Sequence, residues 1–213
     1  MQATTTKELV LVTGSSGLIG ARTADRLSAE FRVAGLDRPG EPHPPSSVEN
    51  IPCDLTSDDS VVQALTMVKG RFGAYIAAGV HLAAYFDCSG EPSSKYSEVT
   101  VEGTRRLLRA LHTLGFRVAR FIFSSTMLVH QPTTPGKPIN EDSPLEPKWA
   151  YPESKVRTEQ LIYQSRGSTP VLILRIAGVY TDWCDSIPVA HQIQRIAERR
   201  LTSHVYPGET THG

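Results

Sequence analysis

Short apolar runs alternate along the chain with longer stretches in which apolar residues recur every three or four positions. The short runs predict buried β-strands, at residues 9–13, 31–36, 48–53, 76–83, 120–124 and 171–175. The longer stretches predict amphipathic helices, at residues 18–29, 58–68, 101–114, 152–164 and 189–200. Strands that alternate with helices in this way are typical of a parallel sheet covered on both faces. The sequence therefore predicts an α/β fold with a Rossmann-type, doubly wound parallel sheet.

The second predicted helix has the clearest start signal. Ser57 can cap it, and the acidic side chains of Asp58 and Asp59 suit the positive end of the helix dipole. The buried face that we expect consists of Val61, Val62, Leu65 and Val68.

Prolines mark the segment before the fourth predicted helix. Residues 131–148 contain five of them, and each fixes the backbone and removes an amide donor. We expect an ordered surface loop here. Pro152 then begins a helix, because proline is well tolerated in a first turn.

Composition and charge narrow the classes of function. The chain has 213 residues, 39% of them hydrophobic, and its 22 Lys and Arg residues balance 22 Asp and Glu residues. Without net charge or a cationic run, we expect neither a nucleic-acid nor a membrane partner, because both attract clustered cations. A membrane span and an export signal are not expected either, which favours the cytoplasm. Cys53, Cys88 and Cys184 are too widely spaced to predict a disulfide framework or a metal site.

Three glycines mark the junction between the first predicted strand and the first helix. Gly14 allows a tight turn, Gly17 allows a phosphate to approach the backbone, and Gly20 allows the helix to pack closely on the sheet. The amides and the dipole at such a helix start favour a diphosphate. The alternative is a glycine-rich turn that binds no ligand.

Asp37 ends the second predicted strand, seventeen residues after Gly20. An acidic side chain there can accept hydrogen bonds from an adenosine ribose, and it would repel the extra phosphate of NADP. We therefore expect NAD rather than NADP, although the cationic Arg38 partly offsets that repulsion. The alternatives are a turn residue for Asp37 and a solvated cation for Arg38.

Candidate chemistry lies farther along the chain. Tyr151 and Lys155 are four residues apart and share one face of a predicted helix. Removing hydride from an alcohol carbon requires a base for the hydroxyl proton, and a nearby cation lowers the pKa of a tyrosine. Ser124, Ser125 and Thr126 end the fifth predicted strand, at the edge where such sheets bind ligands. These hydroxyls bind a substrate oxygen or satisfy backbone groups where the strand ends.

Together these motifs resemble the short-chain dehydrogenase/reductase superfamily, and in particular its extended branch of NAD-dependent epimerases and dehydratases. Gly14, Gly17 and Gly20 have the spacing of that branch's nucleotide loop. Asp54-Leu55 resembles its adenine-contacting pair, and the His-Leu-Ala-Ala sequence at 81–84 resembles its signature beside the cofactor.

The resemblance implies a role for each matching residue. Thr126 would bind the substrate hydroxyl, Tyr151 would be the acid/base, and Lys155 would bind the nicotinamide ribose and lower the pKa of Tyr151. The cofactor would be NAD. The implied cofactor-binding residues are Gly14, Ser16, Gly17, Leu18, Ile19, Gly20, Asp37, Arg38, Asp54, Leu55, Leu82, Ala83, Ala84, Ser124, Tyr151, Lys155 and Ala177.

Departures from the family's pattern bear on the substrate. Met127 and Leu128 follow the threonine where sugar-nucleotide dehydratases have Asp-Glu, so dehydration is not expected. Thr100 and Gly178 stand where asparagines are usual, and His130 stands where glycine is frequent. These differences argue against a nucleotide-sugar substrate but not against the cofactor.

Aromatic residues after the fourth predicted strand suggest a less polar substrate. The expected substrate-side residues are Tyr85, Phe86, Ser125, Thr126 and Met127, and Trp149 and Trp183 flank the same expected cleft. The alternative is that Tyr85 and Phe86 are core aromatics at the end of a strand.

The resemblance also divides the chain. Residues 1–180 would form an NAD-binding Rossmann domain that includes the catalytic residues, and residues 181–213 would begin a substrate-binding lobe that is only partly present. The expected activity is that of an NAD-dependent oxidoreductase or epimerase acting on a secondary alcohol or ketone, with nucleotide sugars among the candidates. The alternatives are a carbonyl or hydroxysteroid-type reductase with an apolar substrate, and a non-catalytic NAD-binding module. A homodimer is expected only by family analogy.

Overall fold

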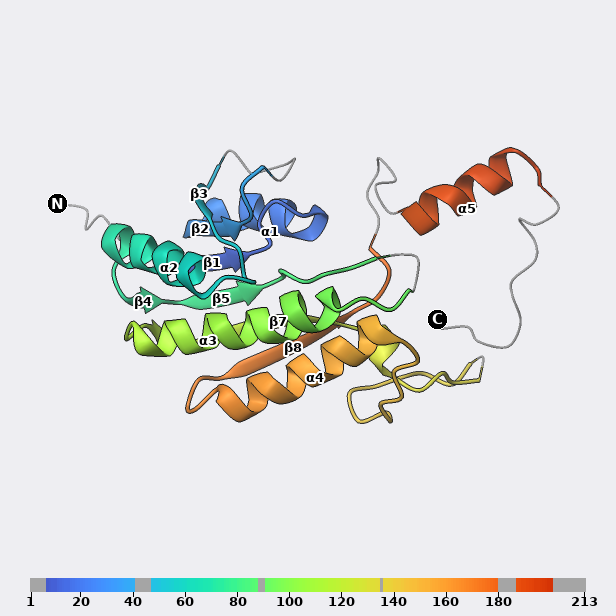
Figure 1. The fold of residues 1–213 in the computed structure, drawn as a ribbon. Coiled ribbons are helices and arrows are strands. Elements are labelled where there is room, and N and C mark those ends of the chain that lie inside the picture. Colours follow the sequence, from blue (N-terminus) through green and yellow to red (C-terminus); the bar gives the residue numbers. More distant parts are fainter. Residues whose placement is uncertain (1–6, 41–46, 88–90, 135, 180–186, 201–213) are drawn as a thin grey trace.

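The computed structural model describes residues 7–40, 47–87, 91–134, 136–179 and 187–200. Cys88, Trp183 and Cys184 therefore lie outside the described residues, as does most of the expected start of a second lobe. A six-stranded parallel sheet in the order β3-β2-β1-β5-β7-β8 forms the centre of the molecule (Figure 1). Its strands are β1 (Leu9–Thr13), β2 (Arg32–Asp37), β3 (Glu49–Pro52), β5 (Ala78–His81), β7 (Phe121–Thr126) and β8 (Val171–Ile176).

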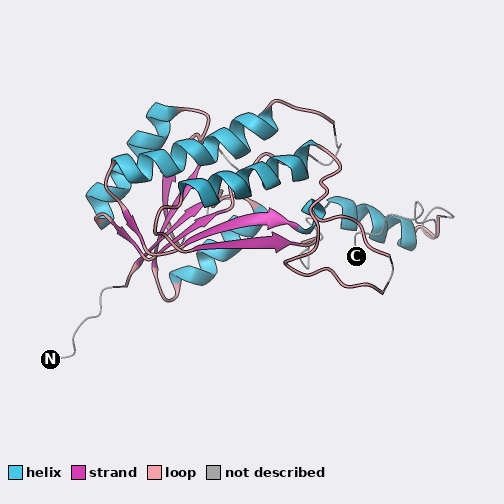
Figure 2. Cartoon of the chain, turned by 90° about the horizontal axis from the view of Figure 1, so that it is seen from below, coloured by secondary structure: helices cyan, strands magenta, loops and turns pink. Residues whose placement is uncertain are grey.

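Helices cover both faces of this sheet (Figure 2). The helices packed around the sheet are α1 (Leu18–Ser28), α2 (Asp58–Phe72), the π-helix η1 (Tyr96–Glu102), α3 (Gly103–Thr113), the 3-10 helix η2 (Met127–Val129) and α4 (Ala150–Ser165). The last helix, α5 (Ile187–Ala197), lies away from the sheet (Figure 1). The chain moves from β1 to β2 in one direction and from β3 through β5 and β7 to β8 in the other. Right-handed crossovers therefore bring α1 to one face and α2, α3 and α4 to the other. The predicted Rossmann-type fold is confirmed.

The fourth predicted strand differs from the prediction. Instead of one strand over 76–83, Tyr75–Ile76 forms β4, which pairs with β6 (Arg117–Val118) in a separate small sheet, and β5 covers only Ala78–His81. Pairing ends at His81 because Gly14, with a φ of 69°, turns β1 away. The chain after His81 consequently leaves the sheet and lies beside the glycine turn.

Helix boundaries show two further differences. The helix expected from residue 101 is preceded by η1, and α4 begins at Ala150 rather than at Pro152. Ser57 caps α2 as predicted, since its Oγ accepts a hydrogen bond of 3.2 Å from the amide of Ser60. The prediction that Val62 is buried is wrong, because its side chain is 43% exposed. The buried stripe runs at helical spacing through Val61, Ala64, Leu65 and Val68, and Val62 is rotated away from it.

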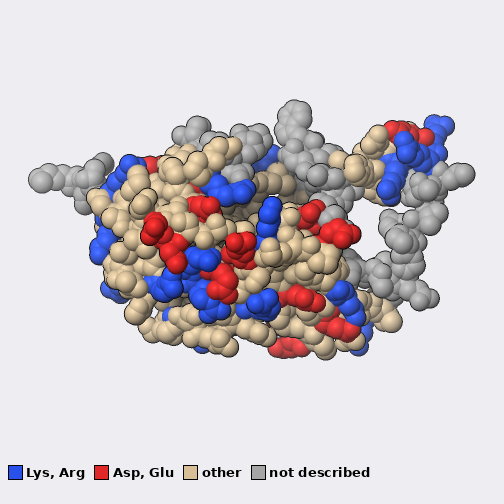
Figure 3. Space-filling model, viewed as in Figure 1, with Lys and Arg blue, Asp and Glu red and all other residues tan. Residues whose placement is uncertain are grey.

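Two apolar clusters stabilise the layers. The larger one lies between the sheet and α2, α3 and α4 and includes Leu11, Leu65, Leu107, Phe123 and Ile162. The smaller one lies beneath α1. Acidic and basic side chains are mixed over the face seen in Figure 3, in keeping with a net charge of zero. None of the helices among the described residues is both long and apolar enough to cross a lipid bilayer.

Cys53 lies within the larger cluster. Burial, together with the negative charges of Asp54 and Asp37, raises the pKa of its thiol to about 12. The thiol is therefore neutral at physiological pH and acts as an apolar packing group rather than as a nucleophile.

A buried histidine connects the ends of β1 and β5. The hydroxyl of Thr104 donates to the carbonyl oxygen of Thr100 at 2.6 Å, so His81 Nε2 donates to Thr104 at 2.8 Å. Its Nδ1 then accepts from the hydroxyl of Thr13 at 2.6 Å. The Thr13 hydroxyl in turn accepts from the amide of Ala83. This chain of bonds holds His81 as the neutral imidazole, and burial, with the nearby charge of Lys155, lowers its pKa to about 3.

The unfolding free energy is expected to fall as the pH drops below about 6.5. Below that pH, His81 is protonated in the unfolded chain, whereas in the folded protein it stays neutral down to about pH 3. Above pH 6.5 both states carry a neutral His81, so this contribution is fully present there. Between pH 7 and pH 5 the loss is about 2 kcal/mol. Urea unfolding at several pH values measures it.

His81→Gln serves as the comparison for this prediction. It is expected to be less stable at pH 7 by about 1–3 kcal/mol, because the buried hydroxyls of Thr13 and Thr104 lose the imidazole as a hydrogen-bond partner. Its unfolding free energy should then change less with pH than that of the wild-type protein between pH 7 and pH 5. Equal changes in both proteins would contradict the role of His81.

Candidate active site

The glycine turn joins β1 to α1 through very close backbone contacts. A Cβ atom on Gly14 would lie 2.8 Å from the amide nitrogen of Ala83, and a Cβ atom on Gly20 would lie 1.8 Å from the carbonyl oxygen of Gly14. Both positions therefore require glycine for the fold itself. For Gly20 the predicted reason was close packing of the helix on the sheet, but the structure shows close packing of α1 on the glycine turn at Gly14.

Gly17 is different from these two glycines. Its φ of −76° is available to any residue, and a Cβ atom there would approach only the Gly14 carbonyl oxygen, at an ordinary 3.4 Å. Gly17 and the neighbouring Leu18 are exposed, whereas Ser16 is buried. Because the fold leaves room for a side chain, the glycine at this position points to a ligand outside the chain.

Asp37 lies directly beside the turn. Its Oδ2 accepts a hydrogen bond of 2.7 Å from the amide of Ser16, and its Oδ1 accepts one of 2.8 Å from the amide of Arg38. The two bonds hold the carboxylate at the carboxyl end of β2, next to the start of α1. A negative charge at this position suits a neutral ribose and opposes a phosphorylated one.

Asp54 and Leu55 follow β3 along the same edge. The Oδ1 of Asp54 accepts from both the amide and the hydroxyl of Thr56, each at 2.9 Å, which orients the carboxylate. The side chain of Leu55 is buried in the core, where a Cβ atom on Gly103 would lie 2.9 Å from it. Leu55 therefore contributes packing to this part of the site.

The remaining residues expected at the cofactor lie along the same edge of the sheet. Leu82, Ala83 and Ala84 follow β5 and are partly buried, with Ala83 against Gly14. Ile19 is partly buried in the first turn of α1, and Ala177 is exposed directly after β8. Parallel strands end together at this edge, so these residues converge although they are distant in sequence.

The predicted catalytic residues meet where β7 ends. The Nζ of Lys155, only 2% exposed, donates a hydrogen bond of 2.7 Å to the carbonyl oxygen of Ser124. It lies 4.8 Å from the centroid of the Phe123 ring and 5.7 Å from that of Tyr151. The hydroxyl of Thr126 lies near enough to the phenol of Tyr151 to lower its pKa in part. The structure thus brings Tyr151, Lys155 and Thr126 together.

The protonation of this group in the free protein depends mainly on burial. Burial raises the pKa of Tyr151 to about 12, although the nearby Thr126 hydroxyl lowers it in part. Burial also lowers the pKa of Lys155 to about 7, opposed by the carboxylate of Glu159. In the free protein the ammonium is bonded to the Ser124 carbonyl oxygen and desolvation of the phenol dominates, so the expected lowering of the pKa of Tyr151 by Lys155 together with the oxidised cofactor stays a prediction.

Aromatic rings surround Tyr151. Phe86 meets it edge-to-face at 4.9 Å between centroids, and Tyr96 lies at 6.2 Å. Tyr85 in turn contacts Tyr96 at 4.9 Å. Tyr96 is buried, but Phe86 is 57% exposed. Phe86 is therefore not a core aromatic, and it forms an open apolar wall beside the phenol.

Three residues near Tyr151 and Lys155 were not predicted from the sequence to be part of the site. Tyr96 lies in η1, Glu159 lies one turn after Lys155 on α4, and Arg175 lies on β8 beside Ser125. The four-residue spacing from Lys155 to Glu159 was the available signal. Only the fold could reveal that Tyr96 and Arg175 lie close to it.

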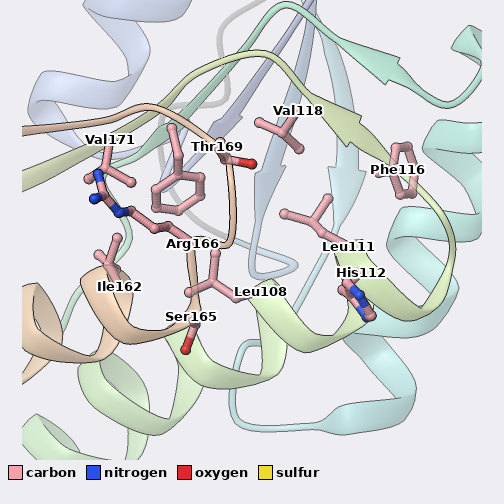
Figure 4. A pocket seen from close by; sticks show the side chains of 11 residues that line it. Leu108, Leu111, His112, Phe116, Val118, Ile162, Ser165, Arg166, Thr169 and Val171 are labelled. Atoms are coloured by element: carbon pink, nitrogen blue, oxygen red, sulfur yellow. The ribbon is translucent and has the colours of Figure 1, made fainter.

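One further cavity and the question of a metal site concern other parts of the described chain. A cavity of about 110 Å³ lies between α3, α4 and the first residues of β7 and β8 (Figure 4). It is therefore at the amino ends of these strands, whereas the candidate site is at their carboxyl ends. The walls of the cavity are mostly apolar and include Leu108, Leu111 and Ile162. Within the described ranges, no three His, Cys, Asp or Glu side chains are grouped so that they could share a metal ion.

Comparison with known families and proteins gives one consistent result. The NAD dependent epimerase/dehydratase family matches residues 10–211. The N-acetyl-alpha-D-glucosaminyl-diphospho-ditrans,octacis-undecaprenol 4-epimerase of Escherichia coli O157:H7 is 28% identical over 166 residues, covering 76% of this chain and 44% of that protein. The UDP-glucose 4-epimerase of Mycolicibacterium smegmatis is 32% identical over 155 residues, covering 70% and 48%. The 3-beta-hydroxysteroid dehydrogenase of Mycolicibacterium neoaurum is 27% identical over 180 residues, covering 80% and 47%.

Solved structures give the same result. The UDP-glucose 4-epimerase of Thermus thermophilus in complex with NAD has a TM-score of 0.70 and 26% identity, covering 90% of this chain and 63% of that one. A short-chain dehydrogenase/reductase superfamily protein of Agrobacterium tumefaciens with bound NAD has a TM-score of 0.68 and 28% identity, covering 96% and 65%. The chain spans about half the length of the curated relatives it matches.

Gly20→Ala is expected to destabilise the protein by about 3 kcal/mol or more, because the added methyl group would overlap the Gly14 carbonyl oxygen. Gly17→Ala is the matched variant, because its methyl group has room, and its loss should stay within about 1 kcal/mol. Chemical unfolding of both variants measures the difference. Equal losses would show that the two glycines have the same structural role.

Proposed function

The chain belongs to the NAD dependent epimerase/dehydratase family, and we propose that it is an NAD-dependent epimerase or oxidoreductase acting on a secondary alcohol or ketone. A nucleotide sugar is the first substrate class to test. The observation that carries this proposal is the meeting of Tyr151, Lys155 and Thr126 where β7 ends, on the sheet edge that also holds the glycine turn.

The residues along this edge fit the parts of NAD. The amides in the first turn of α1, directly after the exposed Gly17, would bind the diphosphate, and no side chain at Gly17 would block its approach. Asp37 would accept hydrogen bonds from the adenosine ribose, and Asp54 would contact the adenine. Lys155 would hold the nicotinamide ribose from the buried end of the site.

When bound, NAD supplies the acceptor for hydride, and the chain's own residues handle the proton. Tyr151 is protonated at neutral pH, which is the form that donates to a ketone oxygen. In the oxidation direction it must first lose this proton, which a positive charge beside the ring would favour. Thr126, whose hydroxyl lies by the phenol of Tyr151, would hold the substrate oxygen at the same point.

The relatives support epimerisation as the first candidate. Two of them are epimerases named for nucleotide-linked or lipid-linked sugars, at 32% and 28% identity. An epimerase would transfer hydride out and back to the opposite face, so no net change in NAD would remain. The activity measurements described below identify the substrate.

A reductase acting on an apolar ketone is the second candidate. The specific observation in its favour is Phe86, 57% exposed and 4.9 Å from the Tyr151 ring. An exposed ring beside the acid/base gains most from contact with an apolar substrate face. The steroid dehydrogenase of Mycolicibacterium neoaurum, 27% identical over 80% of this chain, is a relative of that type.

Calorimetric titration is expected to show that NAD binds and that NADP binds at least about tenfold more weakly, because Asp37 opposes the added phosphate. Gly17→Ala should weaken NAD binding by about tenfold, because a methyl group would meet the diphosphate. Gly70→Ala is the control, since nothing lies within 4 Å of that position. Wild-type affinity in Gly17→Ala, or no affinity in the wild-type protein, would contradict the proposed cofactor site.

Tyr151→Phe is expected to lower turnover by about two to four orders of magnitude while NAD affinity is kept, because only the proton-transfer group is lost. Tyr163→Phe, on an exposed tyrosine of the same helix, is the control. UDP-sugars and steroid ketones are the substrates to test. An isomerised sugar without net NADH supports epimerisation, and stoichiometric NADH consumption with a ketone supports the reductase.

A further inference from the structure

A third polar residue follows Tyr151 and Lys155 on the buried side of α4. Glu159 lies one further turn along the helix, and its side chain is buried, with 5% exposed. The proposed proton transfer does not use it. A carboxylate out of water is unfavourable unless its oxygens are fully bonded, so its partners indicate what it does.

Glu159 is bonded to the next-to-last residue of each of two strands. Its Oε1 accepts from the Ser125 hydroxyl at 2.5 Å and from Arg175 Nε at 3.2 Å, and its Oε2 accepts from Arg175 Nη2 at 2.8 Å. Ser125 and Arg175 are direct neighbours in the pairing of β7 with β8. The carboxylate therefore joins α4 to both strands at once.

Arg175 continues the network into the loop before α4. Its Nη1 donates to the Glu141 carbonyl oxygen at 3.2 Å and faces Nε2 of His130 at 3.3 Å. The Nδ1 of the buried His130 lies 3.2 Å from the Ser143 carbonyl oxygen, so Nδ1 donates and Nε2 accepts from Arg175. Arg175 thus also holds the loop that leads into the first turn of α4.

Three consecutive residues of β7 face three successive turns of α4. The Thr126 hydroxyl lies by the phenol of Tyr151, and the Ser124 carbonyl oxygen accepts a hydrogen bond from Lys155. Between them, the Ser125 hydroxyl donates to Glu159. A shift of the strand end relative to the helix would disturb all three contacts together.

We propose that Glu159 and Arg175 are positioning residues, which hold the end of β7 against α4 and maintain the positive charge of Lys155 for binding the cofactor ribose. The inference rests on the proposed function. Stability alone does not require charges here, because a buried ion pair replaced by neutral side chains of similar size often leaves a protein equally stable.

The charges around Lys155 support this role. Tyr151 and Glu159 face it from its own helix, and the neutral His81 faces it from β5. Arg175 approaches from β8 on the far side of Glu159. Glu159 is the anion of this group, and its carboxylate opposes the burial that lowers the pKa of Lys155 to about 7. Without it, a larger fraction of Lys155 would be neutral at physiological pH.

The test uses the neutral pair Glu159→Gln with Arg175→Gln, because either single change would leave an uncompensated buried charge. A second neutral pair, Glu159→Leu with Arg175→Met, covers the case in which the first fails to fold. The matched control is Glu102→Gln with Arg105→Gln, an exposed ion pair on the neighbouring η1 and α3 segment. Thermal unfolding is measured for all variants.

The first readout is the titration of Lys155 by NMR in the cofactor-free protein, with its signal identified by its loss in Lys155→Met. In the neutral pair the pKa of Lys155 is expected to fall by about one unit, while the control keeps the wild-type value. A wild-type titration in a folded neutral pair would overturn the proposal and leave Glu159 and Arg175 a purely structural role. This readout does not depend on NAD binding.

The second readout is NAD affinity between pH 6 and pH 9. Wild-type affinity is expected to fall as the pH rises through about 7, because Lys155 then loses its proton. At pH 7 the neutral pair should bind about fivefold more weakly, the loss of protonated lysine for a one-unit fall in pKa. If Lys155→Met binds as the wild-type protein does at every pH, the role of Lys155 fails, and with it this inference. If Lys155→Met weakens binding but the neutral pair does not, only this inference fails.

Discussion

The hydrogen bond from Lys155 to the carbonyl oxygen of Ser124 is the contact on which the candidate site depends. It buries an ammonium group beneath α4, where the hydrogen-bonding partners must come from the protein. The end of β7 supplies that partner only because β7 remains paired with β8 as far as Thr126. Sheet pairing, helix packing and the chemistry of the site are therefore one arrangement, and a change in any of them alters the others.

The other half of the site depends on close backbone approach rather than on charge. Gly14 and Gly20 allow β1, the start of α1 and the exit of β5 to come within contact distance. The neutral His81 of β5 joins β1 through Thr13 and α3 through Thr104. The backbone where a cofactor would lie is therefore closely packed in the free protein.

The same arrangement explains the unusual titration of the site in the free protein. Burial favours the neutral form of both Tyr151 and Lys155. The phenol therefore keeps its proton at neutral pH, and the ammonium group of Lys155 loses its proton more easily than an exposed lysine does. A single anion, Glu159, opposes this tendency for the lysine. A charge added beside either group would therefore change its protonation.

Much of the fold could be predicted from the residues alone, because alternating apolar runs and amphipathic stretches have few stable arrangements. The Gly14 turn, the Ser57 cap and the bounds of β1 are local features, decided by backbone conformation and by neighbours within a few residues. Local spacing also placed Tyr151 and Lys155 on one face of a helix. The sequence could not show that β5 would end at His81, because that depends on β1 turning away.

Only the tertiary structure decided how the candidate residues are charged and what surrounds them. The exposure of Phe86 and the burial of Glu159 against Arg175 depend on segments far apart in the chain. So does the raised pKa of Tyr151, which desolvation controls. Sequence by itself determined which residue types share a helix face or end a strand, because those relations are periodic and local. Burial and long-range contacts are properties of the packed molecule, so the electrostatics of the site could be obtained only from the fold.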